Sequence, residues 1–267
     1  LAGFFEEGML MNSLSGIKVR KYVAHRLDQG IANTTVNKEL SLLSSAIKWC
    51  NDQLEWNLPN PVSGKRLPEE EEEARVLTLT ELEKLVVSAT HAWSSHTRKY
   101  LPEFCILGFY TGMRPGEMLE LEWSRVSFER KTIELRVQDT KGKSRRLVAL
   151  SDGAVDSLLR LRAVADEFFP DTPWVFTHTK PRYFGSRIQS VRRVWETAIA
   201  RAGIAWATPH SLRHTSATEA VHAENANVVD IMKRLGHKRL ATTVEYLHTA
   251  DERAQEEVAN LQKIVTF

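Results

Sequence analysis

The segment Pro209-His-Ser-Leu-Arg-His-Thr215 places two imidazoles and one guanidinium at the start of a predicted helix over residues 209–223. His210 and Arg213 are three residues apart, so they lie on one face of that helix. An arginine and a histidine that share a face can bind phosphate oxygens and assist a proton transfer. We interpret His214 as structural, because it cannot easily aim at the same point as His210 while Arg213 also does.

Two segments upstream carry cations suited to phosphate chemistry. Thr111-Gly-Met-Arg-Pro-Gly-Glu117 places Arg114 between a glycine turn and a helix start, where its guanidinium can hold two phosphate oxygens. Asp139-Thr-Lys-Gly-Lys-Ser144 is a turn-forming stretch between two β-rich segments, and Lys141 lies in it. Taken singly, each is more often an ordinary surface feature.

A fourth segment lies downstream. Leu235-Gly-His-Lys238 contains His237, and Val244-Glu-Tyr246 follows it. A lone histidine is usually structural, and a tyrosine among apolar neighbours usually belongs to a core. The four segments together are more specific than any one of them, because they arrive in a fixed order with distinctive neighbours.

A zinc site competes for the same histidines. His210 and His214 have the spacing of the H-E-x-x-H zinc motif, but Ser211 stands where such a hydrolase needs glutamate. Neither Cys50 nor Cys105 lies near enough in sequence to complete a structural site. The sequence therefore predicts no metal and no cofactor, and the two cysteines are expected to be buried thiols in a reducing cytosol.

Periodicity around these segments predicts a mainly α fold with a small antiparallel sheet (α+β). Asn33 or Thr34 is expected to cap the second helix, and Thr80 with Glu83 forms a capping box for the third. Helices are expected at residues 17–27, 34–56, from 80 onward, 97–110, 115–123, 152–168, 184–202, 209–223 and 226–235, with strands at 126–137 and 145–150.

Turn residues and acids divide the chain. Residues 57–64 hold two prolines and a glycine, and residues 69–73 are five consecutive glutamates. We therefore expect a helical domain at residues 1–64, an acidic linker at 65–77 and a second domain at 78–267. The chain opens on leucine, so the first domain is expected to be shortened at its start.

The distribution of charge along the chain is a better indication of phosphate binding than the net charge, which is only +2. Seven arginines and lysines lie within residues 180–213, against one acid. Such a stretch can hold phosphates, although a solvated helix face is the equal alternative. No apolar run approaches the ~20 residues that span a bilayer. Six residues are candidate contacts to a nucleic-acid phosphate backbone: Asn37, Lys38 and Lys48 on the polar and basic face of residues 34–56, and Lys143, Arg187 and Arg192.

The four segments resemble the motifs of the tyrosine recombinases, the phage integrase family. That family has T-G-x-R-x-x-E, a hairpin lysine in K-G, H-x-L-R-H, L-G-H and a tyrosine nine residues later, in this order. Here Tyr246 lies nine residues after His237. The resemblance covers residues 76–250 strongly and residues 14–61 loosely. The looser part rests on Thr34-Thr-Val-Asn-Lys-Glu-Leu40 and Asn60-Pro61.

The resemblance implies a helical DNA-clamping domain, a catalytic domain and a site-specific recombinase that forms a 3′-phosphotyrosyl intermediate. Tyr246 is the implied nucleophile, Lys141 the general acid, and His210 an aid to proton transfer. The implied catalytic set is Arg114, Lys141, His210, Arg213, His237 and Tyr246. A type IB topoisomerase and a non-catalytic DNA-binding regulator are the alternatives.

The resemblance also implies partners. The implied partners are double-stranded DNA and accessory DNA-bending proteins. The chain is expected to be a free monomer that assembles into a homo-tetramer on DNA. The expected location is the cytoplasm, at the nucleoid, with no membrane contact. Residues 250–265 are expected to form a helix with an apolar stripe. By resemblance this tail docks into a neighbouring subunit, and packing on its own catalytic domain is the alternative.

Overall fold

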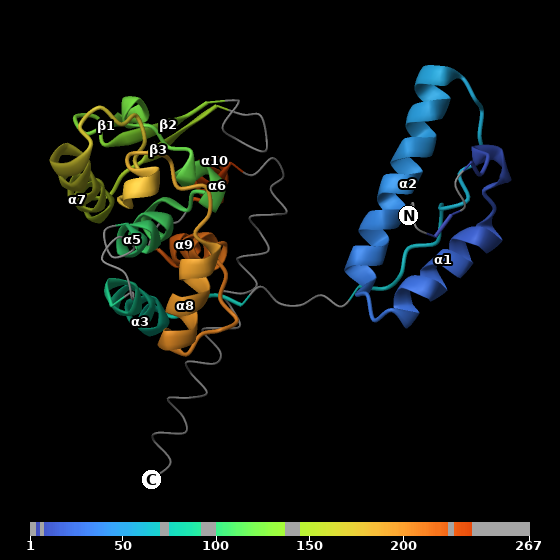
Figure 1. Ribbon diagram of the computed structural model, residues 1–267, viewed down its shortest axis with the longest axis horizontal. Coiled ribbons are helices and arrows are strands. Elements are labelled where there is room, and N and C mark those ends of the chain that lie inside the picture. Colours follow the sequence, from blue (N-terminus) through green and yellow to red (C-terminus); the bar gives the residue numbers. More distant parts are fainter. Residues whose placement is uncertain are drawn as a thin grey trace, which may run out of the picture. The chain divides into compact units, whose positions relative to one another are not determined.

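The computed structural model describes residues 4–5, 8–69, 75–91, 100–136, 145–223 and 227–236. The chain divides into two compact units, Leu1–Glu72 and Glu73–Phe267 (Figure 1). The division lies within the stretch that the sequence marks as an acidic linker. Among the described residues, no helix has the length and apolarity needed to cross a membrane.

The N-terminal unit is a pair of helices, α1 (Gly16–Asp28) and α2 (Asn33–Leu54), preceded by a short 3-10 turn, η1 (Met11–Ser13). Val36, Leu40 and Ile47 of α2 form much of the unit's core, because residues at helical spacing share one face. The buried residues are Leu14, Val19, Tyr22, Val36, Leu40, Ile47 and Val62. Cys50 is only half-buried, which corrects the expectation of two buried thiols.

Both predicted helix caps are wrong. The N-cap of α2 is Ala32, and the amide of Asn33 instead donates to the carbonyl of Pro68 at 2.8 Å. The capping box of α3 (Leu79–Thr90) pairs Thr78 with Glu81, two residues earlier than predicted. Thr80 offers the same local pattern. Leu77, just before the cap, is buried and donates its N–H to Thr215 Oγ1 at 3.0 Å. This long-range contact fixes the chain next to Thr78, where the helix begins.

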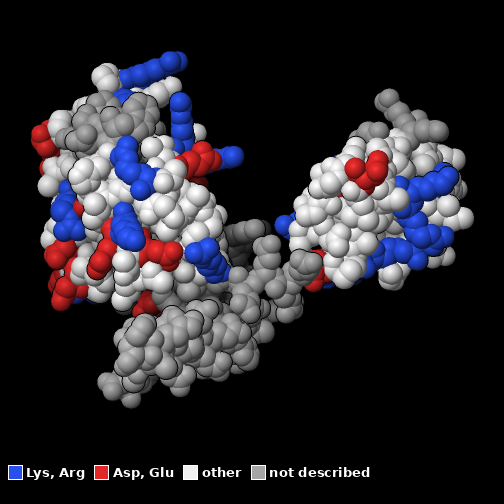
Figure 2. All heavy atoms as spheres, turned by 90° about the horizontal axis from the view of Figure 1, so that it is seen from below, with Lys and Arg blue, Asp and Glu red and all other residues white. Residues whose placement is uncertain are grey.

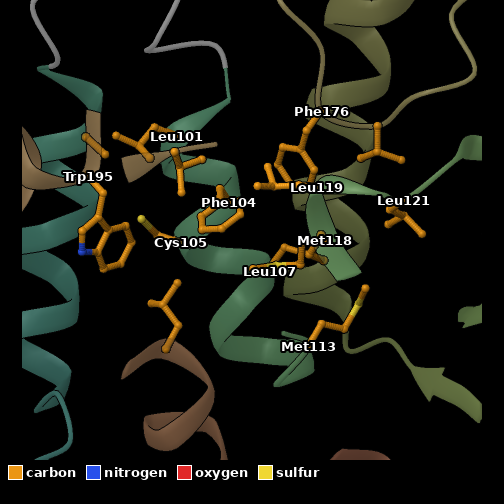
Figure 3. Packing of buried hydrophobic residues seen from close by; sticks show 14 of the residues in the cluster. Leu101, Phe104, Cys105, Leu107, Met113, Met118, Leu119, Leu121, Phe176 and Trp195 are labelled. Carbon is orange, nitrogen blue, oxygen red and sulfur yellow. The ribbon is translucent and has the colours of Figure 1, made fainter. Parts of the chain in front are cut away.

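In the second unit, α5 (Leu101–Thr111) packs against α3, α7 (Asp152–Phe168) and α9 (Ser211–His222). Figure 3 shows Phe104, Cys105 and Leu107 in this core, with Trp195 of α8 (Arg192–Ala202) and Phe176 around them. At Gly108 a β-carbon would lie 2.9 Å from Leu212 Cδ1. The glycine therefore allows α5 and α9 to approach closely, which places Arg213 of α9 beside the end of α5.

The sheet has three antiparallel strands in the order β1 (Val126–Ser127), β2 (Thr132–Leu135) and β3 (Arg146–Ala149). The single long strand predicted at 126–137 is broken by a turn, in which Lys131 has a φ of 46°. Leu135 pairs with Arg146 at the described end of the β2–β3 ladder. Residues 137–144, including the predicted hairpin tip, lie outside the described residues.

Several helices begin or end away from their predicted bounds. α6 (Pro115–Leu119) is shorter than predicted and leads to the 3-10 turn η2 (Trp123–Arg125). α8 begins eight residues late, because residues 177–188 turn back on themselves: Ile188 N donates to Phe176 O, and the 3-10 turn η4 (Pro181–Tyr183) lies within the loop. α10 (Val228–Leu235) starts from an Asn227 cap.

Candidate active site

Arg114 emerges from the tight connection between α5 and α6. Gly112 ends α5 in the left-handed conformation at φ 63°, which glycine adopts without strain. Arg114 then donates twice to the carboxylate of Glu117: its backbone N–H to Oε2 at 2.8 Å and its Nη1 to Oε1 at 2.9 Å. The carboxylate therefore fixes both the start of α6 and the direction of the Arg114 side chain.

A second guanidinium reaches the same carboxylate from the sheet. Arg146 Nη2 lies 2.7 Å from Glu117 Oε2, and Nη1 lies 3.3 Å from Oε1. Burial raises the pKa of the Glu117 carboxyl, but hydrogen bonds from Arg146 and Arg114 outweigh it and hold that pKa below its ordinary value. Glu117 is only 3% exposed. With its lowered pKa, it is an ionised carboxylate held in the interior by two arginines.

Arg213 connects two of the motif segments. It is 2% exposed, and its Nη1 donates to the carbonyl of Gly112 at 2.7 Å, while its Nη2 donates to the carbonyl of Leu235 at 2.6 Å. A planar guanidinium can make both bonds at once, which an ammonium group cannot do in the same geometry. The T-G-x-R segment and the L-G-H segment therefore meet at Arg213.

The two histidines of the third segment differ in setting. His210 is exposed and is the residue before α9, and not inside the helix as predicted. His214 lies one turn later, and the two ring centroids are 5.6 Å apart. Burial, followed by the nearby His210 and Arg213, lowers the pKa of His214 to about 4. His214 is therefore neutral at physiological pH and adds no positive charge to the site.

Three of the predicted catalytic residues, Lys141, His237 and Tyr246, lie outside the described residues. The structure places the residues that flank two of them in sequence. Arg146 lies at the start of β3, five residues after Lys141, and Gly236 ends α10 immediately before His237. The structure thus brings together the segments of Arg114, His210 and Arg213, and Arg146 and Gly236 lie beside Glu117 and Arg213.

A family model described as the phage integrase family matches residues 75–253. The chain belongs to the phage integrase family. Tyrosine recombinase XerC of Corynebacterium glutamicum is 29% identical over 168 residues, which cover 62% of this chain and 53% of that protein. Tyrosine recombinase XerD of Rhizobium meliloti is 26% identical over 266 residues, which cover 95% of this chain and 82% of that protein.

Solved structures share the fold of this integrase family member. XerH site-specific recombinase bound to a palindromic difH substrate superposes with a TM-score of 0.72 at 22% identity, covering 94% of this chain and 73% of that one. The Tn1549 transposon integrase in complex with circular intermediate DNA gives a TM-score of 0.70 at 17% identity, covering 89% and 82%. The family match and the Xer tyrosine recombinase relatives show that the chain is a site-specific DNA recombinase. They favour neither a type IB topoisomerase nor a non-catalytic DNA-binding regulator.

In this recombinase, Lys38 and Lys48 are both exposed on α2. Figure 2 shows lysines and arginines gathered along one side of the N-terminal unit, whereas on the visible face of the second unit both signs of charge are interspersed. A surface on which lysines and arginines gather suits a phosphate backbone, because its attraction does not depend on base sequence.

The predicted contact at Asn37 has a different function in the structure. Asn37 is 4% exposed, its Nδ2 donates to Leu67 O at 2.9 Å and to Glu69 Oε1 at 2.6 Å, and its Oδ1 accepts from Leu67 N at 2.8 Å. The amide therefore ties residues 67–69 onto α2. This use of both its donor and acceptor corrects the expectation that Asn37 faces DNA.

The other predicted DNA contacts lie in the second unit of this integrase. Arg187 forms an ion pair with Glu120 at 3.0 Å, and the exposed Arg192 forms one with Glu196 at 2.9 Å. Exposed pairs such as Arg192–Glu196 contribute little to stability, so Arg192 is not committed to the fold. Arg187 is partly buried, and its guanidinium also lies over the Trp174 ring, 5.2 Å from the centroid. Lys143 lies outside the described residues.

Two residues of the site were missed as functional residues. Glu117 belongs to the quoted T-G-x-R-x-x-E segment, so its spacing from Arg114 was a usable signal. Arg146 carried no such signal, because alternation in Arg146-Leu-Val-Ala149 allows either Arg146 or Leu147 to face inward. In the structure Arg146 is buried and Leu147 is 62% exposed.

Proposed function

We propose that this recombinase cuts and rejoins DNA strands through a 3′-phosphotyrosyl bond at Tyr246. The observation that best supports this assignment is the position of Arg213, whose guanidinium bonds to Gly112 and Leu235, residues 101 and 22 positions away in the chain. Segments that the sequence separates widely are thereby held around one buried cation, as a single phosphate site requires.

The phosphate chemistry accounts for the cations. When the phenol oxygen of Tyr246 attacks phosphorus, a new P–O bond forms, the bond to the 5′ oxygen breaks, and negative charge builds on the non-bridging oxygens. Preorganised donors aimed at that charge lower the barrier most effectively. We assign this function to Arg114, Arg213 and His237.

Two protons move in the same step. The phenol has an ordinary pKa of about 10, so its proton needs an acceptor, and we assign His210 to that transfer. The departing 5′ oxygen needs a proton, and we assign its donor as Lys141. The phosphotyrosyl bond retains the energy of the original phosphodiester, so attack by a 5′ hydroxyl reverses the steps and rejoins strands without ATP.

The proposed function is tested by trapping the intermediate. The chain is incubated, in excess EDTA, with DNA from its own genomic neighbourhood, and covalent 3′ attachment points are mapped. We expect adducts in EDTA, because arginines and a histidine take the place of the magnesium that other nucleases use. Cleavage that needs a divalent ion would contradict the assignment. DNA binding without any adduct would indicate a regulator, and relaxation without partner exchange a topoisomerase.

The N-terminal unit is proposed to grip the DNA backbone, with Lys38 and Lys48 among its contacts. Both are exposed on α2, and lysine contacts to phosphate raise affinity for any sequence. Assembly into a homo-tetramer on DNA, assisted by DNA-bending proteins, is the further proposal that follows from the family.

The tail is proposed to mediate that assembly. Its predicted apolar stripe lies outside the described residues and consists of Ala254, Val258, Leu261 and Ile264. Deleting residues 251–267 is expected to leave DNA binding and half-site adducts, but to abolish recombination between two full sites. A head-to-tail contact of this kind closes into a ring, and the deletion opens it.

Point variants sharpen this experiment. Leu261→Asp places a charge on the stripe and is expected to reproduce the deletion, whereas Glu256→Gln, on the opposite face of the predicted helix, is expected to recombine normally. Recombination that survives the deletion, or a shortened chain that unfolds, would show that the tail packs on its own catalytic unit.

A further inference from the structure

Arg146 is a buried cation that the proposed chemistry does not use directly. Its side chain is 7% exposed, and it enters the interior from β3 on the same face as Val148. A charged side chain on the inward face of a strand loses its hydration, and this loss must be offset by partners. Its hydrogen-bonding partner is Glu117 of α6, and its side chain also packs against Gly236 at the end of α10.

The first partner is the carboxylate that orients Arg114. Arg146 contacts both oxygens of Glu117, and Arg114 contacts the same two oxygens. Glu117 can hold Arg114 in one direction only while its own carboxylate plane is fixed. The two bonds from Arg146 fix that plane, because a guanidinium fork and a carboxylate favour a common plane.

A second contact is made with Gly236, which ends α10. A β-carbon on Gly236 would lie 2.6 Å from Arg146 Nη1, 3.1 Å from Cζ and 3.2 Å from Cδ. The guanidinium therefore lies directly against this glycine, which also has a φ of 69°. The adjacent carbonyl, that of Leu235, accepts from Arg213. Arg146 and Arg213 thus contact the same two-residue stretch.

We propose that Arg146 is a positioning residue for phosphate-bond cleavage: through Glu117 it fixes the guanidinium of Arg114, and by packing against Gly236 it fixes the end of α10 against the site. The proposal rests on the proposed assignment of Arg114 as a phosphate ligand. Arg146 does not itself touch the phosphate. Its loss therefore lowers the rate of the chemical step and leaves DNA affinity nearly intact.

The test compares Arg146→Met with Arg145→Met. These neighbours carry the same charge, but Arg145 is exposed. Within the described part of the chain, its ion pair is with the partly exposed Glu134, at 2.9 Å. Single-turnover cleavage of a half-site is measured at saturating protein, with binding measured separately by gel shift. We expect Arg146→Met to cleave about 10²-fold more slowly, since misplacing a catalytic group by about 1 Å costs about that much. Arg145→Met should cleave at the unmodified rate.

Two further variants separate positioning from folding. Arg146→Lys keeps the charge and loses the fork, so its rate should lie well below the unmodified one. The double variant Glu117→Gln with Arg146→Met removes the buried negative charge together with its partner, so it avoids the cost of an unpaired buried carboxylate. Its cleavage should still be slow, because Arg114 loses the carboxylate that holds it. Circular dichroism and gel-shift affinity establish that each variant is folded before rates are compared.

A substrate with sulfur in place of the 5′ leaving oxygen locates the defect. Sulfur leaves without a proton, so this substrate bypasses the general acid. The Arg146→Met defect should persist on it, because the variant disturbs phosphate binding. Recovery on the sulfur substrate would overturn the proposal by placing the effect in leaving-group protonation, as would normal cleavage by folded Arg146→Met. If the unmodified chain formed no adduct in this assay, the proposed function itself would fail.

Discussion

The Tyr246→Phe variant is expected to form no covalent adduct with DNA, while its affinity for the same DNA stays close to that of the unmodified chain. The substitution removes one hydroxyl oxygen, which is the atom that would bond to phosphorus. DNA affinity comes mainly from contacts between cationic side chains and phosphates, and those contacts remain. This is the largest effect that we expect from any single substitution.

Adducts are measured as a shifted band on a denaturing gel, beside a native gel shift for binding. Tyr183→Phe is the matched control, because it removes a phenol hydroxyl from the same unit at a side chain that is 48% exposed. It should form adducts normally. An adduct that survives in Tyr246→Phe would remove Tyr246 as the nucleophile, and loss in both variants would point to damage unrelated to the chemistry.

The Lys141→Ala variant is expected to cleave an ordinary substrate about 10²–10⁴-fold more slowly, which is the usual contribution of a positioned general acid or base. A 5′ alkoxide is a poor leaving group without a proton. When sulfur replaces the 5′ leaving oxygen, the thiolate departs unprotonated, so the variant should recover most of its rate on that substrate. Recovery specific to the sulfur substrate identifies a proton donor and distinguishes it from a binding group.

Lys143→Ala is the control for this experiment, since it removes a second lysine from the same predicted turn. Any loss of rate should be equal on the two substrates, because a predicted DNA contact affects binding and not protonation of the leaving group. If Lys141→Ala is equally slow on the oxygen and sulfur substrates, Lys141 serves only to bind. If Lys143→Ala shows the selective recovery instead, Lys143 is the acid.

The predicted bounds of one helix match the structure. Residues 152–168 were expected to form one helix, and α7 spans Asp152–Phe168. Helix prediction was less accurate where local signals competed or were incomplete. Thr78 and Thr80 both precede a glutamate by three residues, and the helix begins from the first of them. Residues 184–191 were predicted to be helical, but Gly185 N donates to His178 O and Ile188 N to Phe176 O, 7 and 12 residues back in the chain. Such pairing is invisible to a local pattern.

The sequence by itself determined the family, the mainly helical fold and the order of the segments that concentrate phosphate-binding groups. It could do so because the chemistry demands particular residue types, and their neighbours along the chain are characteristic. The tertiary structure decided how those groups are held. It assigned the buried Glu117 to both Arg114 and Arg146. A strand pattern leaves open which of two alternate faces is buried, and only packing against other elements makes that choice.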